Sequence, residues 1–523
     1  MTQCRNRKDT DEESNKESNK ESSAARVISL LKSVFKHEEF RGEQEKIISL
    51  AMSGDNSLVL MPTGTGKSLC YQMPAVAGEG LVLVISPLIA LMQDQVTRAR
   101  SLGIRAAAIN SAMSKQDREE RMRKLEAGHW QLLYVTPERF KNPEFVSALN
   151  EYQKKTKIQL LAIDEAHCIS QWGHDFRPDY SRLGEFRSLI GSPPVMALTA
   201  TATPAVQKDI LKQLQMEDAV VFAGGIERPN LALYVHEVYG IDEKIRGMAA
   251  LRHQVPGSAI FYFSLIQTLQ KVSQELSRLS VPHYVYHGNL PTEVRHRNQK
   301  EFLQDKTDSG PLMLATPAFG LGVDKADVRL LVHAEIPNSV ESYFQEVGRA
   351  GRDGKSSQCH LFFDHDDVSI QMEFIKWANP DPSFIRKVYQ LIKGNPLQVE
   401  QQGTEYLSEQ MNFYNKRDYR VETAVNLLER WGCLIEKRGP GTQNSRFPYS
   451  LGVEPTDDMI TDAQVKQRIK TQNEKLLEMV RFASLDSSVD APKCRMAFVL
   501  EYFGQFQKTC GICDLCQKTS PNL

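Results

Sequence analysis

The chain has 523 residues, so we expect about three or four domains, and its 41% of hydrophobic residues is normal for soluble ones. Because the formal net charge is only −1, we expect no general affinity for nucleic acid. The longest apolar run, Leu81 to Met92, is interrupted by Ser86 and Pro87 and is too short to cross a bilayer. Because the polar N-terminus also lacks a signal-peptide core, we expect no membrane partner and a cytoplasmic location.

Residues 1–24 repeat Glu-Ser-Asn-Lys and carry no large apolar residue after Met1, which predicts a disordered tail. From Val27 onward, apolar residues recur with helical spacing. Gln44 lies near the expected start of a further helix, where a glutamine commonly serves only to cap the helix. A role for Gln44 beyond capping depends on the motifs that come later in the chain.

A phosphate-binding loop is predicted directly after a short apolar strand over 57–61. Its glycines allow successive backbone N–H groups to turn toward a polyphosphate. Lys67 is expected to reach the β and γ phosphates, and the Ser68 hydroxyl is expected to bind Mg²⁺. The predicted nucleotide-binding residues of this loop are Thr63, Gly64, Thr65, Gly66, Lys67 and Ser68.

Two adjacent carboxylates end another apolar run, Leu160 to Ile163. Such a run is typical of a buried parallel strand, and α/β proteins bind ligands at the carboxyl edge of their sheets. Asp164 suits a Mg²⁺ ion held through its water shell, whereas Glu165 suits polarising the water that attacks a terminal phosphate. The sequence therefore predicts an α/β domain that binds a nucleotide and Mg²⁺ at this edge.

A polar loop rich in aromatic residues comes next in the chain. Exposed rings beside a guanidinium form a stacking platform for unpaired bases. The alternative is that the rings belong to the core, although their irregular spacing is poor for packing. Because the loop is attached to the strand of Asp164, base stacking could move Glu165 and His167. The predicted base-stacking residues are Trp172, His174, Phe176 and Arg177.

A second group of candidate catalytic residues lies much later in the chain, in the segment from Gln345 to Arg352. An arginine donated across a cleft stabilises the charge that spreads over a transferring phosphoryl group. We expect Arg352 to be this arginine, with Arg349 and Gln345 supporting it from the same face. The alternative is a structural salt bridge, which does not require this Gln-x-x-Gly-Arg-x-Gly-Arg pattern.

Four of the nine cysteines cluster near the end of the chain. Their spacing is rare in disulfide frameworks and typical of a four-thiolate Zn²⁺ site. The predicted zinc ligands are Cys494, Cys510, Cys513 and Cys516. The remaining cysteines are scattered, and we expect them to be reduced thiols.

The segment 381–460 contains a predicted helix from Val421 to Trp431 and two possible strands, Leu434 to Lys437 and Arg446 to Leu451. A helix followed by a hairpin resembles a winged helix. Basic residues before the helix and at the hairpin suit contacts with DNA phosphates: Lys416, Arg417, Arg420, Lys437, Arg438 and Arg446. A helical insertion without DNA contacts accounts for the same pattern, because any solvated helix and hairpin carry such charges.

The Asp-Glu-Ala-His box at 164–167, the aromatic loop, the segment ending at Arg352 and the cysteine cluster together resemble the RecQ family of superfamily-two DNA helicases. The resemblance implies that Gln44 pairs with the adenine edge, that His167 belongs to the catalytic set, and that 199–203 couples the nucleotide state to DNA binding. The alternative for the last segment is a simple helix cap at Thr203. The implied domains are RecA-like domains with parallel sheets over 25–228 and 229–380, the insertion over 381–465, and a small helical zinc-binding subdomain over 466–523.

The function implied by this resemblance is ATP-dependent unwinding of duplex DNA, with 3′ to 5′ movement on single-stranded DNA, in DNA repair or recombination. The expected cofactors are ATP, Mg²⁺ and Zn²⁺. Single-stranded and duplex DNA are the expected partners, and single-strand-binding protein is a candidate partner. The expected location is the cytoplasm, with the nucleoid in a bacterium, or the nucleus in a eukaryote. Two alternatives stay open: an RNA helicase or a translocase that does not separate DNA strands, and a DNA-binding clamp whose affinity ATP switches.

Overall fold

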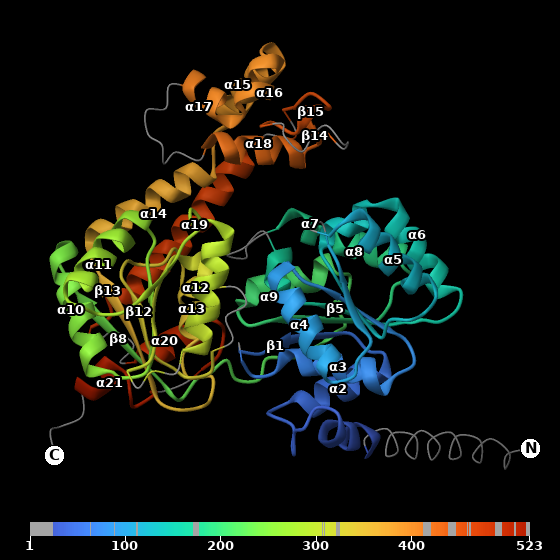
Figure 1. Cartoon of the computed structure of the whole chain (residues 1–523), viewed down its shortest axis with the longest axis horizontal. Helices are drawn as coiled ribbons and strands as arrows, with labels where there is room; N and C mark the ends of the chain where they lie inside the picture. Colours follow the sequence, from blue (N-terminus) through green and yellow to red (C-terminus); the bar gives the residue numbers. More distant parts are fainter. Residues whose placement is uncertain are drawn as a thin grey trace, which may run out of the picture.

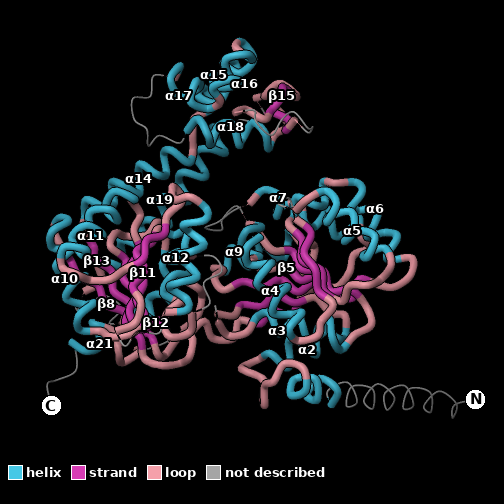
Figure 2. Tube along the Cα trace, in the orientation of Figure 1, coloured by secondary structure: helices cyan, strands magenta, loops and turns pink. Residues whose placement is uncertain are grey.

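Two sheets of parallel strands, covered by helices, form two lobes that lie side by side (Figures 1 and 2). The computed structural model describes residues 25–518 except 63, 88, 111–112, 171–176, 306, 308, 321–324, 412–419, 438–445, 458, 460–461, 487–493 and 507–508. The predicted tail over 1–24 therefore lies outside the described residues, as do Thr63, Trp172, His174, Phe176, Lys416, Arg417 and Arg438. The predicted α/β fold with two parallel sheets is confirmed.

Lobe 1 is built on seven parallel strands in the order β3-β4-β2-β5-β6-β1-β7. Its central strands are almost entirely apolar because helices cover both faces, and every residue of β2 and β5, Gln159 included, is buried. The carboxyl ends of β1 and β5 lie at one edge with β6 between them, so the phosphate loop and Asp164 emerge close together. After a helical stretch over 25–33, the elements are α2 (Gln44–Ser53), β1 (Ser57–Leu60), α3 (Lys67–Ala77), β2 (Leu81–Ile85), α4 (Ile89–Ser101), β3 (Ala106–Ile109), α5 (Lys115–Glu126), β4 (Leu132–Val135), η1 (Pro137–Lys141), α6 (Pro143–Gln153), β5 (Ile158–Ile163), η2 (Ala166–Ile169), α7 (Pro178–Ser181), α8 (Leu183–Leu189), β6 (Val195–Thr199), α9 (Pro204–Gln213) and β7 (Val220–Phe222).

Lobe 2 has six parallel strands in the order β10-β11-β9-β12-β13-β8. Residues 223–230, between β7 and β8, form the interlobe linker. The long edge strand β8 follows this linker directly and pairs along its whole length with β13. The elements are β8 (Leu231–Glu237), α10 (Gly240–Gln254), β9 (Ser258–Tyr262), α11 (Ile266–Arg278), β10 (Tyr284–Tyr286), α12 (Thr292–Gln304), β11 (Leu312–Ala315), η3 (Pro317–Phe319), β12 (Val328–His333), α13 (Val340–Val347), β13 (Ser357–Phe363) and α14 (His365–Ala378).

The insertion stands above the two lobes in Figure 1 and has a hydrophobic core of its own, which includes Phe384, Val388 and Leu428. The predicted helix and both predicted strands are confirmed, and the two strands pair antiparallel. The elements are α15 (Pro382–Gly394), α16 (Pro396–Gln402), α17 (Thr404–Gln410), α18 (Arg420–Arg430), β14 (Leu434–Glu436) and β15 (Tyr449–Leu451).

The C-terminal region returns to lobe 2. Its long helix α19 (Asp462–Ala483) packs against α14 and α13, and α20 (Arg495–Tyr502) and α21 (Asp514–Lys518) come after it. Apolar side chains of this region share one core with lobe 2, and the four clustered cysteines belong to this core. Within the described part of the chain, no helix is both long and apolar enough to span a membrane.

Candidate nucleotide and zinc sites

The phosphate loop has the backbone form that its glycines predict. Gly64 and Gly66 adopt φ values of +83° and +90°, which glycine adopts without steric cost, and α3 begins immediately afterwards at Lys67. The Lys67 ammonium is buried and has no hydrogen-bond partner in the described structure. A buried cation without a partner is costly. The donor set therefore fits a polyphosphate, which would complete it.

Gln44 is 2% exposed and contacts the phosphate loop directly. Its Nε2 donates to the carbonyl oxygen of Thr65 at 3.0 Å and to that of Gly66 at 3.3 Å, while its Oε1 accepts from the backbone N–H of Arg41 at 2.9 Å. A Cβ on Gly66 would lie 2.6 Å from Nε2 of Gln44. Gln44 thus stabilises the phosphate loop through two hydrogen bonds to its carbonyl oxygens. Its pairing with adenine stays a prediction.

Asp164 and Glu165 lie where the end of β5 meets the phosphate loop. Burial, and secondly the neighbouring Glu165 carboxylate, raise the pKa of Asp164 to about 6, while Lys67 acts in the opposite direction. Glu165 occupies the left-handed region at φ +51°, which is strained for a residue with a side chain. Its side chain is only 12% exposed, and Oε2 has no hydrogen-bond partner in the described structure. This carboxylate oxygen is available for a water or a proton.

His167 connects Glu165 to the threonine segment at the end of β6. Its Nδ1 lies 3.4 Å from Oε2 of Glu165 and 2.9 Å from Oγ1 of Thr199. Thr199 in turn accepts from the backbone N–H of Thr201 at 3.2 Å. The cap predicted at Thr203 is also present, since its hydroxyl accepts from Val206 N. The segment therefore serves both as a helix cap and as a contact of the carboxylate site.

The opposite wall of the cleft comes from lobe 2. A cavity of about 430 Å³ is lined by the Arg41–Glu43 turn, the phosphate loop, the interlobe linker and Arg352. Arg352 packs so closely on the phosphate loop that a Cβ on Gly64 would lie 2.9 Å from its Cγ. Arg349 is instead buried beside Gly320, and neither it nor the half-buried Gln345 lines the cavity. Of the three predicted residues, Arg352 is the one at the phosphate loop.

The linker residue Arg228 fixes the arginine segment, a role that the sequence did not predict. Its buried guanidinium donates to the carbonyl oxygens of Gly348, Ala350 and Gly351 at 3.0, 2.7 and 3.0 Å. Asn230 adds a bond of 2.9 Å to the Gly351 carbonyl. The segment from Ile226 to Leu231 resembles the family's linker into the second RecA-like domain, but this pattern does not predict the partners of Arg228 and Asn230.

The aromatic loop is represented in the described structure by Arg177 alone. The Arg177 guanidinium donates to the Pro87 carbonyl oxygen at 3.0 Å, and the Arg177 backbone N–H donates to Cys168 O at 2.9 Å. Both contacts attach the end of the loop to the first lobe beside the carboxylate strand. DNA contacts of Arg177 and of the other loop residues stay predictions.

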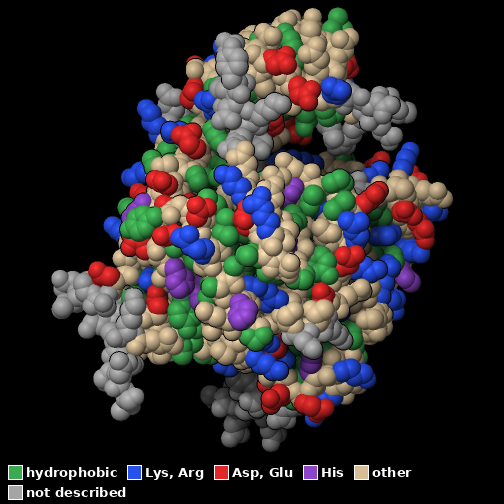
Figure 3. Space-filling view, turned by 60° about the vertical axis from the view of Figure 1, so that its left-hand side comes forward, with side chains coloured by type: hydrophobic (Ala, Val, Ile, Leu, Met, Phe, Trp, Pro, Cys, Tyr) green, Lys and Arg blue, Asp and Glu red, His purple; other side chains and the backbone are tan. Residues whose placement is uncertain are grey.

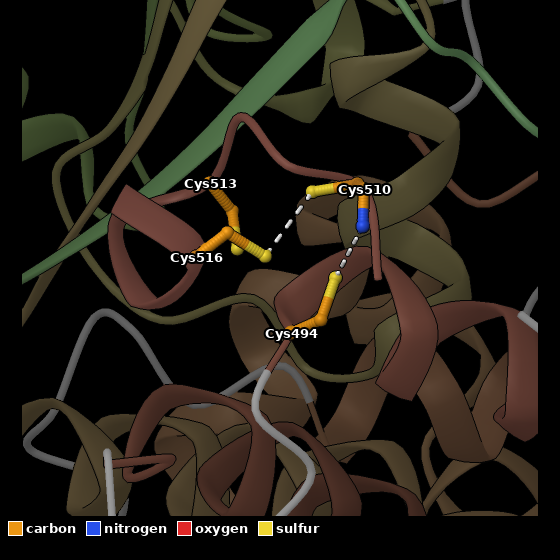
Figure 4. Close-up of side chains that lie close together, drawn as sticks. All are labelled: Cys494, Cys510, Cys513 and Cys516. Atoms are coloured by element: carbon orange, nitrogen blue, oxygen red, sulfur yellow. Dashed lines mark hydrogen bonds between the residues drawn. The ribbon is translucent and has the colours of Figure 1, made fainter. Parts of the chain in front are cut away.

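The four cysteines meet at one point in the C-terminal region, as Figure 4 shows. Their sulfur atoms all lie within 4.8 Å of one another, and those of Cys510 and Cys516 are 3.9 Å apart. Tetrahedral Zn²⁺ with Zn–S bonds of about 2.3 Å requires sulfur separations of about 3.8 Å, so the arrangement fits this ion.

A buried ion pair supports the cysteine cluster. Arg495 donates to Asp514 at 2.7 Å and to the Phe482 carbonyl oxygen at 2.7 Å. The other oxygen of Asp514 accepts from the backbone N–H of Val235 at 3.1 Å, which attaches the cluster to strand β8 of lobe 2. The cysteine cluster is thereby fixed to lobe 2.

The insertion contains charges that were predicted to bind DNA. Lys437 forms an ion pair with Glu400 at 2.9 Å, and Arg446 contacts Glu405 at 3.5 Å. Arg420 lies over the ring of Phe384 at 5.1 Å. These residues stabilise contacts inside the insertion, so phosphates would compete for them with the insertion's own carboxylates.

A phosphate loop opposite an arginine from a second RecA-like lobe defines a two-lobed, nucleotide-driven motor of the helicase class. Family models agree part by part: DEAD/DEAH box helicase over 41–210, helicase conserved C-terminal domain over 243–354, and RecQ zinc-binding over 453–517. The chain is 38% identical over 408 residues to the probable ATP-dependent DNA helicase RecS of Bacillus subtilis, covering 78% of this chain and 80% of the relative. The chain belongs to the RecQ family of ATP-dependent DNA helicases.

The ATP-dependent DNA helicase RecQ of Haemophilus influenzae is 41% identical over 347 residues, which is 66% of this chain and 54% of the relative. The chain thus spans just over half the length of this relative. The crystal structure of the DUF1998 helicase MrfA bound to DNA and AMPPNP matches with a TM-score of 0.53 at 20% identity, covering 66% of this chain and 51% of that one. This structural likeness supports the fold.

Proposed function

We propose that the protein is an ATP-dependent DNA helicase that moves 3′ to 5′ on single-stranded DNA and unwinds duplex DNA. The observation that carries this proposal is the contact of Arg352, a lobe 2 residue, with Gly64 of the phosphate loop in lobe 1. A nucleotide in this cleft would touch both lobes, so its binding and hydrolysis would change their spacing. The relatives from Bacillus subtilis and Haemophilus influenzae are named DNA helicases, which favours DNA as the substrate.

Each residue at the cleft has a proposed part in ATP turnover. Lys67 holds the β and γ phosphates, and Ser68 and Asp164 hold Mg²⁺, which would neutralise charge on the phosphate oxygens when bound. Glu165 orients the attacking water and accepts its proton, because its Oε2 is buried without a hydrogen-bond partner in the described structure. Arg352 stabilises the charge of the transferring phosphoryl group from the other lobe.

The proposed DNA path crosses the first lobe at the aromatic loop and continues beneath the insertion. Figure 3 shows a hollow beneath the insertion, with Lys and Arg side chains on the surface below it. Stacking of unpaired bases on Trp172 and Phe176 would change the position of Glu165 through His167. His167 contacts both the Glu165 carboxylate and Thr199. We further propose that the helical segment and hairpin of the insertion act as a winged helix on duplex DNA.

We propose DNA repair or recombination as the pathway, which the resemblance to RecQ helicases implies. The proposed location is accordingly the nucleoid region of a bacterial cytoplasm or a eukaryotic nucleus, with single-strand-binding protein as a partner on the displaced strand. Co-purification of tagged protein with single-strand-binding protein, compared with and without nuclease treatment, checks a direct contact. A signal that disappears with nuclease would mean that DNA alone bridges them.

Strand displacement on matched DNA and RNA duplexes with identical tails tests the proposed function. We expect displacement of the DNA duplex with ATP, none with a non-hydrolysable analogue, and little displacement of the RNA duplex. DNA-stimulated ATP turnover without displacement would indicate a translocase. ATP-dependent DNA affinity without turnover would indicate a clamp.

A further inference from the structure

One turn of the zinc-binding region contacts both lobes. It consists of Phe503, Gly504 and Gln505, directly after α20. The Gln505 backbone N–H donates to the Leu500 carbonyl at 2.8 Å, and that of Gly504 donates to the Glu501 carbonyl at 2.9 Å. With Gly504 at φ +77°, these two bonds form the left-handed end that closes many helices. The direction of the turn is therefore fixed by α20.

Two residues of this turn contact lobe 1. Gly504 lies so close to Pro204 that a Cβ on it would be 2.7 Å from Pro204 Cγ. Gln505 Nε2 donates to the Ala223 carbonyl oxygen at 3.0 Å. Pro204 begins α9, directly after the threonine segment that contacts His167. Ala223 is followed by two linker glycines that line the nucleotide cavity.

The third residue of the turn contacts lobe 2. The Phe503 ring packs against the Phe344 ring of α13, with centroids 5.7 Å apart, and both side chains are buried. Helix α13 ends just before the arginine segment that carries Arg352. The linker that Gln505 holds continues to Arg228, which binds three carbonyl oxygens of that same segment. The turn is thus connected to the segment of Arg352 in two ways. Phe503 contacts α13, which precedes this segment, and Gln505 holds the linker that contains Arg228.

We propose that Gln505 is a positioning residue that sets the interlobe linker for nucleotide binding, and this inference rests on the proposed ATP turnover at that cleft. The linker after Ala223 is a Gly-Gly pair, which has large conformational freedom unless something holds it. The bond from Gln505 removes part of that freedom before the nucleotide arrives. Without this bond, the linker loses its conformational freedom only when the nucleotide binds, and this entropy cost lowers the affinity for nucleotide. The groups that perform hydrolysis stay in place.

Gln505→Ala and Gln505→Glu test this inference, because neither side chain can donate to the Ala223 carbonyl oxygen and the second keeps the size of glutamine. Glu501→Gln is the matched control, since Glu501 is exposed and lies in the last turn of α20, four residues before Gln505. Both Gln505 variants should raise the KM for ATP by about three- to tenfold, the equivalent of one hydrogen bond, with kcat within about twofold. Zinc content and melting temperature should equal those of the wild type.

An unchanged KM in both Gln505 variants would overturn the inference. So would a loss of zinc or a lowered melting temperature in proportion to the kinetic defect, because the bond would then stabilise only the fold. Direct binding of a fluorescent ATP analogue separates this inference from the proposed function. A wild-type protein that binds the analogue but neither hydrolyses ATP nor unwinds DNA would refute the proposed function. Even then, weaker binding of the analogue by the Gln505 variants would support the positioning role. A Kd equal to that of the wild type would refute the positioning role.

Discussion

Replacing Arg352 with alanine removes the one predicted arginine that the structure brings to the phosphate loop. The side chain packs on Gly64 from the second lobe and lines the nucleotide cavity. Because it belongs to lobe 2, its loss leaves Lys67, Asp164 and Glu165 unchanged. We therefore expect Arg352→Ala to bind ATP but to hydrolyse it slowly.

The size of the effect is set by the charge that Arg352 places in the cleft. Two unit charges about 4 Å apart attract by about 4 kcal/mol at an effective dielectric constant of about 20. An interaction of that size, made in the transition state, corresponds to about a thousandfold in rate. Arginines donated across a cleft in other phosphoryl-transfer enzymes contribute about 10³ to 10⁵ in kcat, which agrees with this magnitude.

The assay is steady-state ATP turnover with saturating single-stranded DNA. Arg352→Ala should lower kcat about a thousandfold with KM changed by less than about threefold, because the stabilised charge develops only in the transition state. Arg352→Lys should recover a minor part of the activity, since an ammonium lacks the planar fork of donors. Arg278→Ala, at a position where the side chain is 74% exposed, is the control and should match the wild type. A kcat within tenfold of the wild type in Arg352→Ala would refute the assignment.

Four further predictions concern separate parts of the chain. Glu165→Gln should retain ATP but slow its hydrolysis by at least about 10²-fold, whereas weak retention of labelled ATP in filter binding would contradict a proton-accepting role. Cys510→Ser should lose stoichiometric zinc by elemental analysis and destabilise the C-terminal region by several kcal/mol, on the order of what thiolate ligation supplies; full zinc content would refute the site. Burial raises the pKa of Glu335, two residues after β12, from 4.5 to about 7, so the folded state binds the proton more tightly and stability falls as pH rises through that window. The free energy of unfolding of Glu335→Gln should equal that of the wild type near pH 5 and exceed it by about 1–3 kcal/mol near pH 8, and equal values at both pH would exclude a buried charge. Alanine at Lys437 and Arg446 should weaken duplex binding and lower its salt dependence by up to about one log unit per lost phosphate contact, and unchanged binding by a folded variant would make the insertion a spacer.

The parts of the site that the sequence predicts are those with a local cause. Gly64 and Gly66 need positive φ at a strand-to-helix turn, and this requirement is visible in the letters alone. Asp164 ends an apolar run of strand length, so its place at the sheet edge can be deduced from the pattern. The same holds for the helix before Gly432, whose φ of +73° ends it where expected.

The parts that the sequence does not predict depend on contacts between distant segments. The Gln44 side chain donates hydrogen bonds to the phosphate loop, because folding brings that loop next to α2. Arg228 binds carbonyl oxygens in a segment of lobe 2 that the chain reaches only after most of that sheet. Lys437 forms an ion pair with Glu400, which lies far from it in the sequence. Local spacing contains no information about such pairings.

Unwinding of matched 3′-tailed and 5′-tailed DNA duplexes, with and without ATP, tests the central claim most directly. Wild-type protein should separate the 3′-tailed duplex with ATP and Mg²⁺, leave the 5′-tailed duplex intact, and separate neither without ATP. Glu165→Gln should bind the 3′-tailed duplex without separating it. Equal separation of both duplexes, or separation without ATP, would contradict a motor that moves 3′ to 5′ by closing its lobes on ATP.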